Sequence, residues 1–362
     1  MRTQRLAPWS ALAVAAALAL SACASTAVES DPATTLSIAP SAERTSAPAA
    51  PEDPRPEVVW PLTGEDATGA NEADLARPAL SIKIENSSAA RPQSNLQHAD
   101  VVFEEQVEYG ISRFVAIFHS DVPETVGPIR SMRPMDKNIM GSFGGPLIFS
   151  GAQSRFISGT TSTGQEVIAQ DTGDYGFYRT SDKAAPHNLH GRTADFFAQT
   201  DADAPDQQWE YAYPAQDSTI VADGETATTV DMNISPQMQP EWRWDSDASE
   251  WMRYEGGSPH VTDDGTQLST TNIVILWTKL QETGRGAGGG SVPETIVVRD
   301  SGTGWAVSGN RYIPINWSKA GQFDPFVFTT TDGEPVTFMP GKTWVELVPE
   351  SGGAGKGSVE IS

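Results

Sequence analysis

The sequence predicts an α+β protein in which a mixed N-terminal half is followed by a mostly antiparallel β half. Two residue distributions support this division. No tryptophan occurs between Trp60 and Trp209, whereas eight of the ten tryptophans lie from Trp209 onward. By contrast, four of the five histidines precede residue 200. We place the boundary in the Asp-, Ala- and Pro-rich stretch at residues 200–240.

The first half is expected to mix strands with helices. Apolar residues alternate along residues 79–85, as Leu80, Ile82 and Ile84, which is the period of a strand. Tyr109-Gly110 predicts a tight connection between two later strands. Those further strands are expected at residues 100–107, 113–120 and 146–150, and helices are expected at about 134–143, 163–170 and 191–199.

The second half is expected to be nearly all β. The apolar run at residues 272–279 (NIVILWTK) predicts a central strand, and Asp332-Gly333 is a strong hairpin signal. The glycine-rich residues 284–290 predict a mobile loop, and the missing Lys-Ser/Thr and helix exclude a phosphate-binding P-loop. Other strands are expected at 242–244, 251–254, 295–298, 304–317 (with a turn at Gly309-Asn310), 326–331 and 335–339, with 343–348 as the last strand before a flexible tail at 351–362.

The chain of 362 residues contains one cysteine, Cys23, which excludes an intramolecular disulfide and cysteine-rich zinc or iron–sulfur sites. Residues 1–23 have a basic start and an apolar run at 11–20, shorter than the roughly 20 residues of a membrane-spanning helix. They end in Leu-Ser-Ala-Cys, which resembles a bacterial lipobox and implies that the Cys23 thiol is lipidated. The alternative is an ordinary signal peptide that ends in a cysteine by chance.

Composition limits the expected partners. The formal net charge of −23, from 24 Lys+Arg and 47 Asp+Glu, argues against a nucleic-acid partner, because phosphate backbones are bound by clustered basic residues. Residues 24–58 are rich in Ala, Ser, Thr and Pro and predict a disordered tether. We therefore expect a protein attached through Cys23 to the extracytoplasmic face of the cell membrane, with no metal and no cofactor.

Six short strings in the first half, and two in the second, resemble the YerB-like bacterial lipoproteins. The resemblance covers about residues 60–350 and implies an α+β fold whose first domain is a layered sandwich of sheet and helices. The family has no assigned reaction. We expect an N-terminal domain at 59–205, a connecting segment at 206–240 and a β-rich C-terminal domain at 241–350. The strings are residues 61–64 (PLTG), 90–94 (ARPQS), 99–105 (ADVVFEE), 110–114 (GISRF), 127–134 (GPIRSMRP), 186–189 (PHNL), 272–275 (NIVI) and 340–345 (PGKTWV).

Arginines stand out in the acidic first half. The planar guanidinium group suits bidentate binding of carboxylate or phosphate, which predicts a pocket for an anionic ligand. The alternative is structural, with Arg113 and Arg130 holding strands together through Glu104 and Glu108. The residues proposed to form the pocket are Arg91, Arg113, Arg130, Arg133, Glu104 and Glu105, with Glu108 and Asp136 nearby.

The second candidate is the segment Pro186–His190 (PHNLH). His187 could act as a general base and Asn188 could hold an oxyanion or orient the imidazole. The spacing of His187 and His190 also allows metal binding, although no His-Glu-x-x-His motif is present. The alternative is a hydrogen-bonding loop that closes the domain. No Gly-x-Ser-x-Gly or Ser-x-x-Lys motif marks a nucleophile, which leaves as candidates Ser131, Ser150 and Ser154.

Two further patterns suggest ligand classes. Residues 130–133 (Arg-Ser-x-Arg) resemble a short part of the LytR–CpsA–Psr phosphotransferases, whose arginines hold a lipid pyrophosphate. Trp242 and Trp244 share one face of a predicted strand and Trp251 lies across from it, so these rings could stack on a cell-wall glycan. The alternative is that they pack in the core, where we also expect Trp277 and Trp344.

Two functions remain open. The first is a non-enzymatic cell-envelope binding protein with an arginine-lined site for an anionic ligand. The second is an envelope hydrolase or phosphotransferase that uses His187 and Asn188 beside Arg113, Arg130 and Arg133. The lack of a catalytic motif favours binding.

Overall fold

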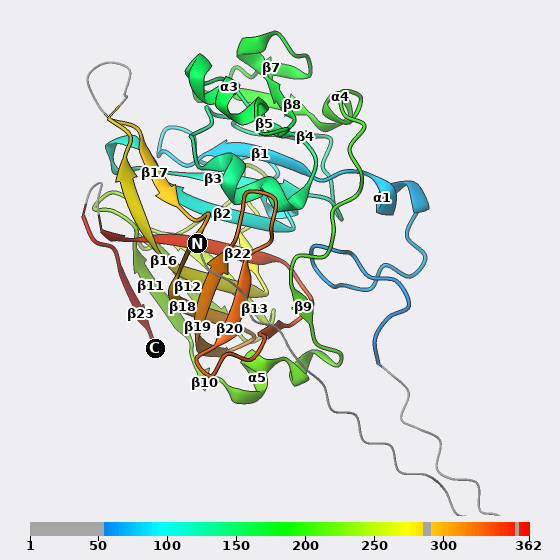
Figure 1. Ribbon diagram of the computed structural model, residues 1–362, viewed down its shortest axis with the longest axis vertical. Coiled ribbons are helices and arrows are strands. Elements are labelled where there is room, and N and C mark those ends of the chain that lie inside the picture. The colour runs from blue at the N-terminus through cyan, green and yellow to red at the C-terminus, as the bar shows by residue number, and fades with distance from the viewer. Residues whose placement is uncertain (1–53, 285–290, 352–354) are drawn as a thin grey trace, which may run out of the picture. The chain divides into compact units, whose positions relative to one another are not determined.

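The computed structural model describes residues 54–284, 291–351 and 355–362 (Figure 1). The expected leader, Cys23, and residues 24–53 of the expected tether lie outside the described residues. So do residues 285–290 of the expected mobile loop. No helix in the described ranges combines the length and apolarity needed to cross a membrane.

The described chain is mostly β, and its few helices are short. Five α-helices and five 3-10 turns connect or cover the strands. They are α1 (Glu72–Ala76), α2 (Asp136–Met140), α3 (Ser154–Thr161), α4 (Thr193–Phe197), α5 (Thr219–Asp223), η1 (Leu96–His98), η2 (Glu108–Gly110), η3 (Gly141–Phe143), η4 (Gln170–Thr172) and η5 (Ala215–Asp217).

The largest sheet within the described residues has twelve strands and contains segments of both halves of the chain. Its central path, from one edge to the other, is β10 (Glu225–Thr226), β19 (Arg311–Lys319), β18 (Asp300–Ser308), β16 (Asn272–Glu282), β22 (Thr343–Ser351), β2 (Val101–Gln106), β3 (Ser112–Phe118), β1 (Leu80–Glu85), β5 (Leu147–Phe149) and β6 (Val167–Ala169). The other two strands are β17 (Pro293–Ile296), paired with β16, and β20 (Val327–Thr330), paired with β19.

Strand β22 joins the two halves. It lies between β16 and β2 and runs parallel to both (Figure 1). Its residues Trp344 and Val345 therefore pair with Val102 and Phe103 on one side, although these residues are far apart in the sequence. One continuous sheet consequently carries side chains of both halves on each face.

Smaller sheets complete the fold. Six strands form a second sheet, and three more form a small sheet near β1 (Figure 1). The second sheet contains β14 (Ser258–Pro259), β13 (Glu250–Glu255), β12 (Pro240–Asp245), β11 (Thr229–Asn233) and β23 (Ser358–Ile361), with β15 (Ser269–Thr270) on β13. The remaining strands are β4 (Thr125–Val126), β8 (Leu189–Arg192) and β7 (Phe177–Arg179), and the pair β21 (Thr337–Phe338) and β9 (Glu210–Tyr211).

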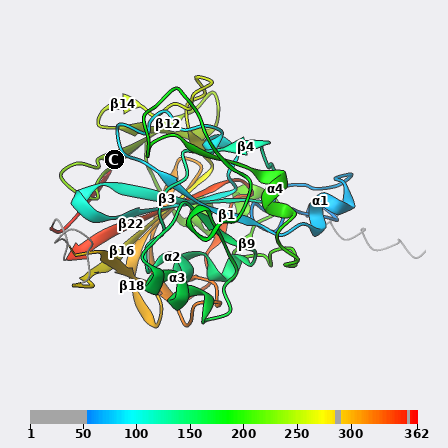
Figure 2. The same ribbon diagram turned by 90° about the horizontal axis from the view of Figure 1, so that it is seen from above.

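The large sheet is covered on both faces by apolar side chains. One core contains Phe103 and Val115 with residues of α2, and the other contains Phe114 with Trp242 and Trp251 of the second sheet. Figure 2 shows α2 and α3 on one side of β3 and β22, with β12 and β14 on the other. Because side chains alternate along each strand, neighbouring residues enter different cores. We call these the helix side and the second-sheet side of the large sheet.

Many of the strand predictions are confirmed. The runs at 79–85, 100–107, 113–120 and 272–279 overlap β1, β2, β3 and the start of β16. The connection at Tyr109-Gly110 is confirmed, and both residues have positive φ, of 65° and 68°. Asp332-Gly333 also forms a turn, in which the amide of Thr330 donates to the carbonyl of Glu334 at 2.8 Å.

Two predictions are wrong. The helix expected at 163–170 is replaced by strand β6, because Val167 and Ile168 pair with β5 at the sheet edge, and the helix lies earlier, at Ser154–Thr161. The tail expected to be flexible contains a further strand after β22, since Ser358–Ile361 pairs with β11. Apolar Val359 and Ile361 pack against the second-sheet core, which favours an ordered strand there.

Candidate functional site

Two adjacent glutamates on β2 face opposite sides of the large sheet. Strand alternation directs Glu105 to the helix side and Glu104 to the second-sheet side. In the register of the sheet, Glu105 lies opposite Arg113, which also lies opposite Glu85. All four side chains are buried. The ends of β1, β2 and β3 therefore carry a separate ionic group on each face.

On the helix side, Lys83 is fully buried between two carboxylates. Its ammonium hydrogen-bonds to Glu105 and lies 2.8 Å from Oδ1 of Asp136. Burial and the adjacent carboxylate of Asp136 raise the pKa of Glu105 well above its usual value. Oδ2 of Asp136 accepts a hydrogen bond from the amide of Arg133 at 2.8 Å. This group fixes the start of α2, and the segment before it, against the sheet.

Arg113 and Arg130 lie beside the group formed by Lys83 and its two carboxylates, and some of their N–H donors have no acceptor among the residues described. Nη1 of Arg113 donates to the carbonyl of Ser131 at 2.7 Å, and no carboxylate of the described residues lies within ion-pair distance of Arg113. Nε of Arg130 lies 3.5 Å from Oε2 of Glu85. Within the described part of the chain, the buried Nε atoms of both arginines have no hydrogen-bond partner.

Arg133 completes a group of three guanidinium groups. Its Nε donates to Oε2 of Glu108 at 2.7 Å. Burial, together with the positive charges of Arg133 and Arg130, lowers the pKa of Arg113 to about 9. Mutual repulsion of this kind favours an additional anion, which a guanidinium binds through charge-assisted hydrogen bonds. We call Arg113, Arg130 and Arg133 the arginine triad.

A cavity of about 350 Å³ opens beside Arg133. Ser131 lines it, and the hydroxyl of Ser131 lies 3.2 Å from that of Ser150. Phe156 supplies an apolar wall, whereas Glu108 and Asp171 each place a carboxylate in the lining. Of the arginine triad, Arg133 lines this cavity, whereas Arg113 and Arg130 do not.

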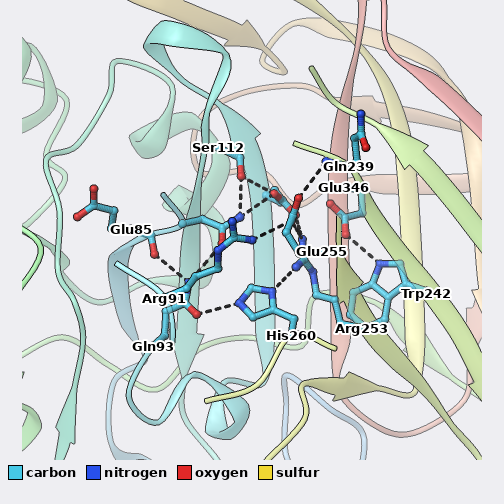
Figure 3. A network of polar contacts seen from close by, with 12 residues as sticks. Glu85, Arg91, Gln93, Ser112, Gln239, Trp242, Arg253, Glu255, His260 and Glu346 are labelled. Atoms are coloured by element: carbon cyan, nitrogen blue, oxygen red, sulfur yellow. Dashed lines mark hydrogen bonds and ion pairs between the residues drawn. The ribbon is translucent and has the colours of Figure 1, made fainter. Parts of the chain in front are cut away.

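Arg91, the fourth predicted arginine, is not part of the triad. It belongs to the second-sheet side, where its Nη1 lies 3.8 Å from Oε2 of Glu255. In Figure 3 the carboxylate of Glu85 points away from Arg91. The six residues predicted for one pocket are thus divided between two faces of the sheet, and Glu104 is likewise on the face of Arg91.

His187 lies at the edge of the arginine triad. Its Nδ1 is 3.0 Å from Oε1 of Glu85, the same carboxylate that faces Arg130. Oε1 of Glu85 also accepts a hydrogen bond from Ser87 at 2.9 Å. A carboxylate on Nδ1 holds that nitrogen protonated and leaves Nε2 as the basic atom. The side chain of His187 is about one-quarter exposed, at 27%.

The other predicted catalytic residues do not assemble around His187. Asn188 accepts a hydrogen bond from Arg179 at 2.9 Å and donates to the carbonyl of Thr180 at 2.7 Å, so its amide holds the connection between β7 and β8. Among the described residues, no hydrogen bond joins Ser131, Ser150 or Ser154 to His187.

A histidine–serine contact that sequence reasoning did not find involves His190. Its Nε2 lies 3.1 Å from Oγ of Ser94, which also hydrogen-bonds to Asp263. The carboxylate contacts the serine rather than the imidazole. This differs from a catalytic triad, in which the acid orients the histidine. The hydrogen bond from Ser94 to Asp263 joins the two halves of the chain.

The second-sheet side contains a closed ring of buried side chains centred on Arg253 (Figure 3). Nη2 of Arg253 donates to Glu104 at 2.5 Å and Nη1 contacts Nδ1 of His260. Because arginine only donates, Nδ1 accepts, and Nε2 donates to Oε1 of Gln93 at 2.8 Å. The amide of Gln93 donates to Asn86, whose amide donates back to Glu104 at 3.2 Å.

Sequence reasoning also missed Arg253. The available signal was strand periodicity, because Arg253 shares a face with Trp251, two residues earlier. Trp242 and Trp251 are completely buried and Trp344 is nearly so, which supports the core alternative rather than an exposed glycan platform for these rings. Trp244 and Trp277 are partly buried. Within the described residues, no group of three or more His, Cys, Asp or Glu side chains is arranged to hold a metal ion.

Comparison with known families gives the class of this protein. Residues 62–206 match the model of "Protein of unknown function (DUF3048) N-terminal domain", and residues 230–345 match that of its C-terminal domain. The chain belongs to this family.

The chain is also similar to a named bacterial protein, which confirms the resemblance seen in the sequence strings. It is 26% identical over 293 residues to "Putative lipoprotein YerB" of Bacillus subtilis (strain 168), across 76% of this chain and 82% of that protein. The crystal structure of YerB protein from Bacillus subtilis matches with a TM-score of 0.70 and 22% identity, covering 84% of this chain and 100% of that chain. The two proteins therefore share a fold.

Proposed function

We propose that this protein is a lipid-anchored, extracytoplasmic binding protein that captures an anionic ligand with the arginine triad. One observation carries the proposal: three guanidinium groups lie together in a chain of net charge −23. Their ion-pair partners among the described residues are Glu85 and Glu108. The three guanidinium groups thus outnumber these two carboxylates by one, and Asp171 adds a further carboxylate to the lining of the adjacent cavity.

The chemistry of the triad favours an oxyanion. Two buried Nε–H donors, on Arg113 and Arg130, have no acceptor among the described residues. A buried donor without a partner costs roughly 1–3 kcal/mol, and a phosphate or carboxylate oxygen would remove that cost. The cavity beside Arg133 gives the rest of the ligand room. A cell-envelope component that carries phosphate or carboxylate would suit both features.

Attachment to the membrane is the second part of the proposal. The leader ends in Leu-Ser-Ala-Cys, and a Bacillus relative carries the name of a lipoprotein. A diacylglyceryl group on Cys23 would hold the chain stably, because two acyl chains anchor far better than one. Residues 24–58 would then place the folded part at a distance from the bilayer.

Ligand binding can be tested by titrating the full chain with inorganic phosphate and pyrophosphate at constant ionic strength. We expect saturable binding and a rise in Tm, because a ligand that binds the folded state stabilises it. Arg133→Gln should weaken binding at least tenfold. Arg243→Gln is the matched control, because it removes an exposed guanidinium that pairs with Glu241. Equal binding by all three proteins, or no saturable binding, would refute the arginine site.

An enzymatic function is supported by one specific contact, between His187 and Glu85. A carboxylate on Nδ1 is the arrangement that activates a histidine as a general base. The pyrophosphate samples should therefore be assayed for hydrolysis by water to two inorganic phosphates, with His187→Gln as the comparison. Hydrolysis that depends on His187 would assign a phosphoryl-transfer activity, whereas binding without hydrolysis would retain the non-enzymatic function.

A further inference from the structure

A second cavity, of about 380 Å³, opens on the second-sheet side of the large sheet, away from the arginine triad. Its size falls within the range of roughly 300–1,000 Å³ that is usual for small-molecule sites. Its lining combines charged or polar groups with apolar walls from both halves of the chain. The residues that matter for binding are Arg91, Glu255, His260, Pro92, Pro259 and Val261.

Two opposite charges face this cavity without a hydrogen bond between them. Nη1 of Arg91 lies 3.8 Å from Oε2 of Glu255, which is too long for a hydrogen bond. The side chain of Arg91 is 25% exposed and that of Glu255 is 6% exposed. Among the described residues, the guanidinium of Arg91 has no hydrogen-bond acceptor. Two parallel N–H donors of this guanidinium are therefore available to a ligand.

The carboxylate of Glu255 is held in place from behind. Its Oε1 accepts a hydrogen bond from the amide of Gln239 at 2.9 Å, and its Oε2 lies 3.3 Å from Nη2 of Arg253 (Figure 3). Each carboxylate oxygen has two lone pairs, so both can accept a further hydrogen bond. Burial raises the pKa of Glu255, whereas the positive charge of Arg253 opposes this rise, and a ligand cation would favour the ionised form in the same way. Glu255 thus offers a fixed, buried carboxylate to a ligand cation.

His260 contributes a neutral wall. Both of its ring nitrogens are occupied, Nδ1 by Arg253 and Nε2 by Gln93. Burial and the nearby positive charges of Arg253 and Arg91 keep its pKa well below the usual value. The cavity therefore presents one cation and one anion, close together and rigidly supported.

We propose that this cavity binds a small zwitterion of the amino-acid class, with the ligand carboxylate on Arg91 and the ligand ammonium on Glu255. The aliphatic part of the ligand would contact Pro92, Pro259 and Val261. A free amino acid and a short unblocked peptide both carry these two groups. The site is independent of the arginine triad, because the two share no lining residue.

The test is calorimetric titration of the full chain with alanine, dialanine, alanine methyl ester and N-acetylalanine. We expect saturable binding of alanine, or of dialanine if the ligand is a peptide, and at least tenfold weaker binding of the ester and the acetylated compound. Each of these two lacks one charge. Equal binding of all four, or no saturable binding of either unblocked compound at millimolar concentration, would overturn the proposal.

Variants locate the binding. Arg91→Gln should reduce the affinity at least tenfold, while Arg133→Gln, in the arginine triad, should bind alanine as the wild type does. Val261→Trp should block the cavity without changing a charge, which keeps the proposal testable if Arg91→Gln unfolds. Unchanged affinity in both cavity variants would place any binding elsewhere and refute the site. Phosphate binding is measured separately, so failure of this proposal leaves the arginine triad unaffected.

Discussion

Nη2 of Arg253 lies 2.5 Å from Oε2 of Glu104, although the two residues are 149 positions apart in the sequence. Neither side chain is exposed to solvent. Arg253 belongs to the second sheet and Glu104 to the large sheet, so this ion pair connects two layers of the fold. The guanidinium also lies 5.2 Å from the ring of Trp344. Removal of either charge would leave the other buried and unpaired.

Replacement of Arg253 by methionine should therefore be strongly destabilising. Methionine fills similar space but leaves the carboxylate of Glu104 without its cation, a loss that costs about 3–5 kcal/mol in comparable buried pairs. The free energy of unfolding should be measured by urea denaturation. Arg243→Met, at a largely exposed position of β12, should change it by less than about 0.5 kcal/mol. A loss below 1 kcal/mol for Arg253→Met would contradict the importance of this pair.

Much of the large sheet could be predicted from local sequence, because alternation and apolar runs are properties of short segments. The alternation in β2 also indicates that Glu104 and Glu105 face opposite sides. Their partners could not be predicted, since Arg253 and Lys83 reach them only after distant strands pair. The position of β22 between β16 and β2 has no local signal, and it decides which side chains meet.

Glu346 should be a neutral carboxylic acid in the folded protein. It lies directly opposite Glu104 on the adjacent strand, and burial, followed by the charge of Glu104, raises its pKa well above 4.5. A raised folded-state pKa stabilises the protein fully below pH 4.5, and this contribution is lost as the pH rises toward the folded-state pKa. Glu346→Gln keeps the neutral form at every pH, and its amide oxygen can still accept the hydrogen bond from Trp242.

The stability of Glu346→Gln relative to wild type should accordingly increase with pH. The difference should grow by about 1.4 kcal/mol per pH unit above pH 4.5, until the folded-state carboxyl itself ionises. Urea denaturation between pH 4 and 8 would measure it. Glu360→Gln, on the exposed side of β23, is the control and should show no such trend. A wild-type protein that gains stability over Glu346→Gln as the pH rises would show that Glu346 is ionised.

His119 should make the protein sensitive to acid. Burial, and then the charge of Arg77, lower the pKa of His119 from 6.5 to about 4. The unfolded chain therefore binds a proton that the folded chain does not, and stability is lost as the pH falls from 6.5 toward 4, by up to roughly 3 kcal/mol. His119→Phe should remove this pH dependence and retain the edge contact with Trp60, whose ring centroid lies 5.5 Å away.

Urea denaturation of His119→Phe and wild type at pH 7 and pH 4.5 would test this expectation. His98→Gln, at a partly exposed position beside Asp121, serves as the control for general effects of histidine removal. The loss on acidification should be smaller in His119→Phe than in the other two proteins. An equal loss in all three would assign the acid sensitivity to other groups.

The candidate site shows a similar limit of sequence reasoning. The arginine-rich segment at 130–133 can be recognised in the sequence, and both of its arginines lie near Arg113 in the structure. The assignment of Arg91 to the same pocket depended on proximity in sequence, whereas the face of the sheet determines its surroundings. Ser94 likewise contacts His190 of the first half and Asp263 of a second-half loop through one hydroxyl, although the three residues are far apart in the sequence. Contacts between the layers of the fold produce no periodic pattern of residues in the sequence.

The last strand offers a prediction on stability. Strand β23 pairs with β11 from Ser358 to Ile361, and the carbonyl of Ser362 accepts hydrogen bonds from the amides of Thr228 and Thr229 at 2.6 and 2.9 Å. Deletion of residues 358–362 should lower the free energy of unfolding by about 2 kcal/mol, because apolar surface and edge pairing are lost, and Tm should fall by several degrees. Calorimetry would measure the change in Tm. The double variant Val359→Ser, Ile361→Ser keeps the backbone pairing but loses the apolar packing, so it separates the two contributions. An unchanged Tm after the deletion would show that the C-terminal residues contribute nothing to the second sheet.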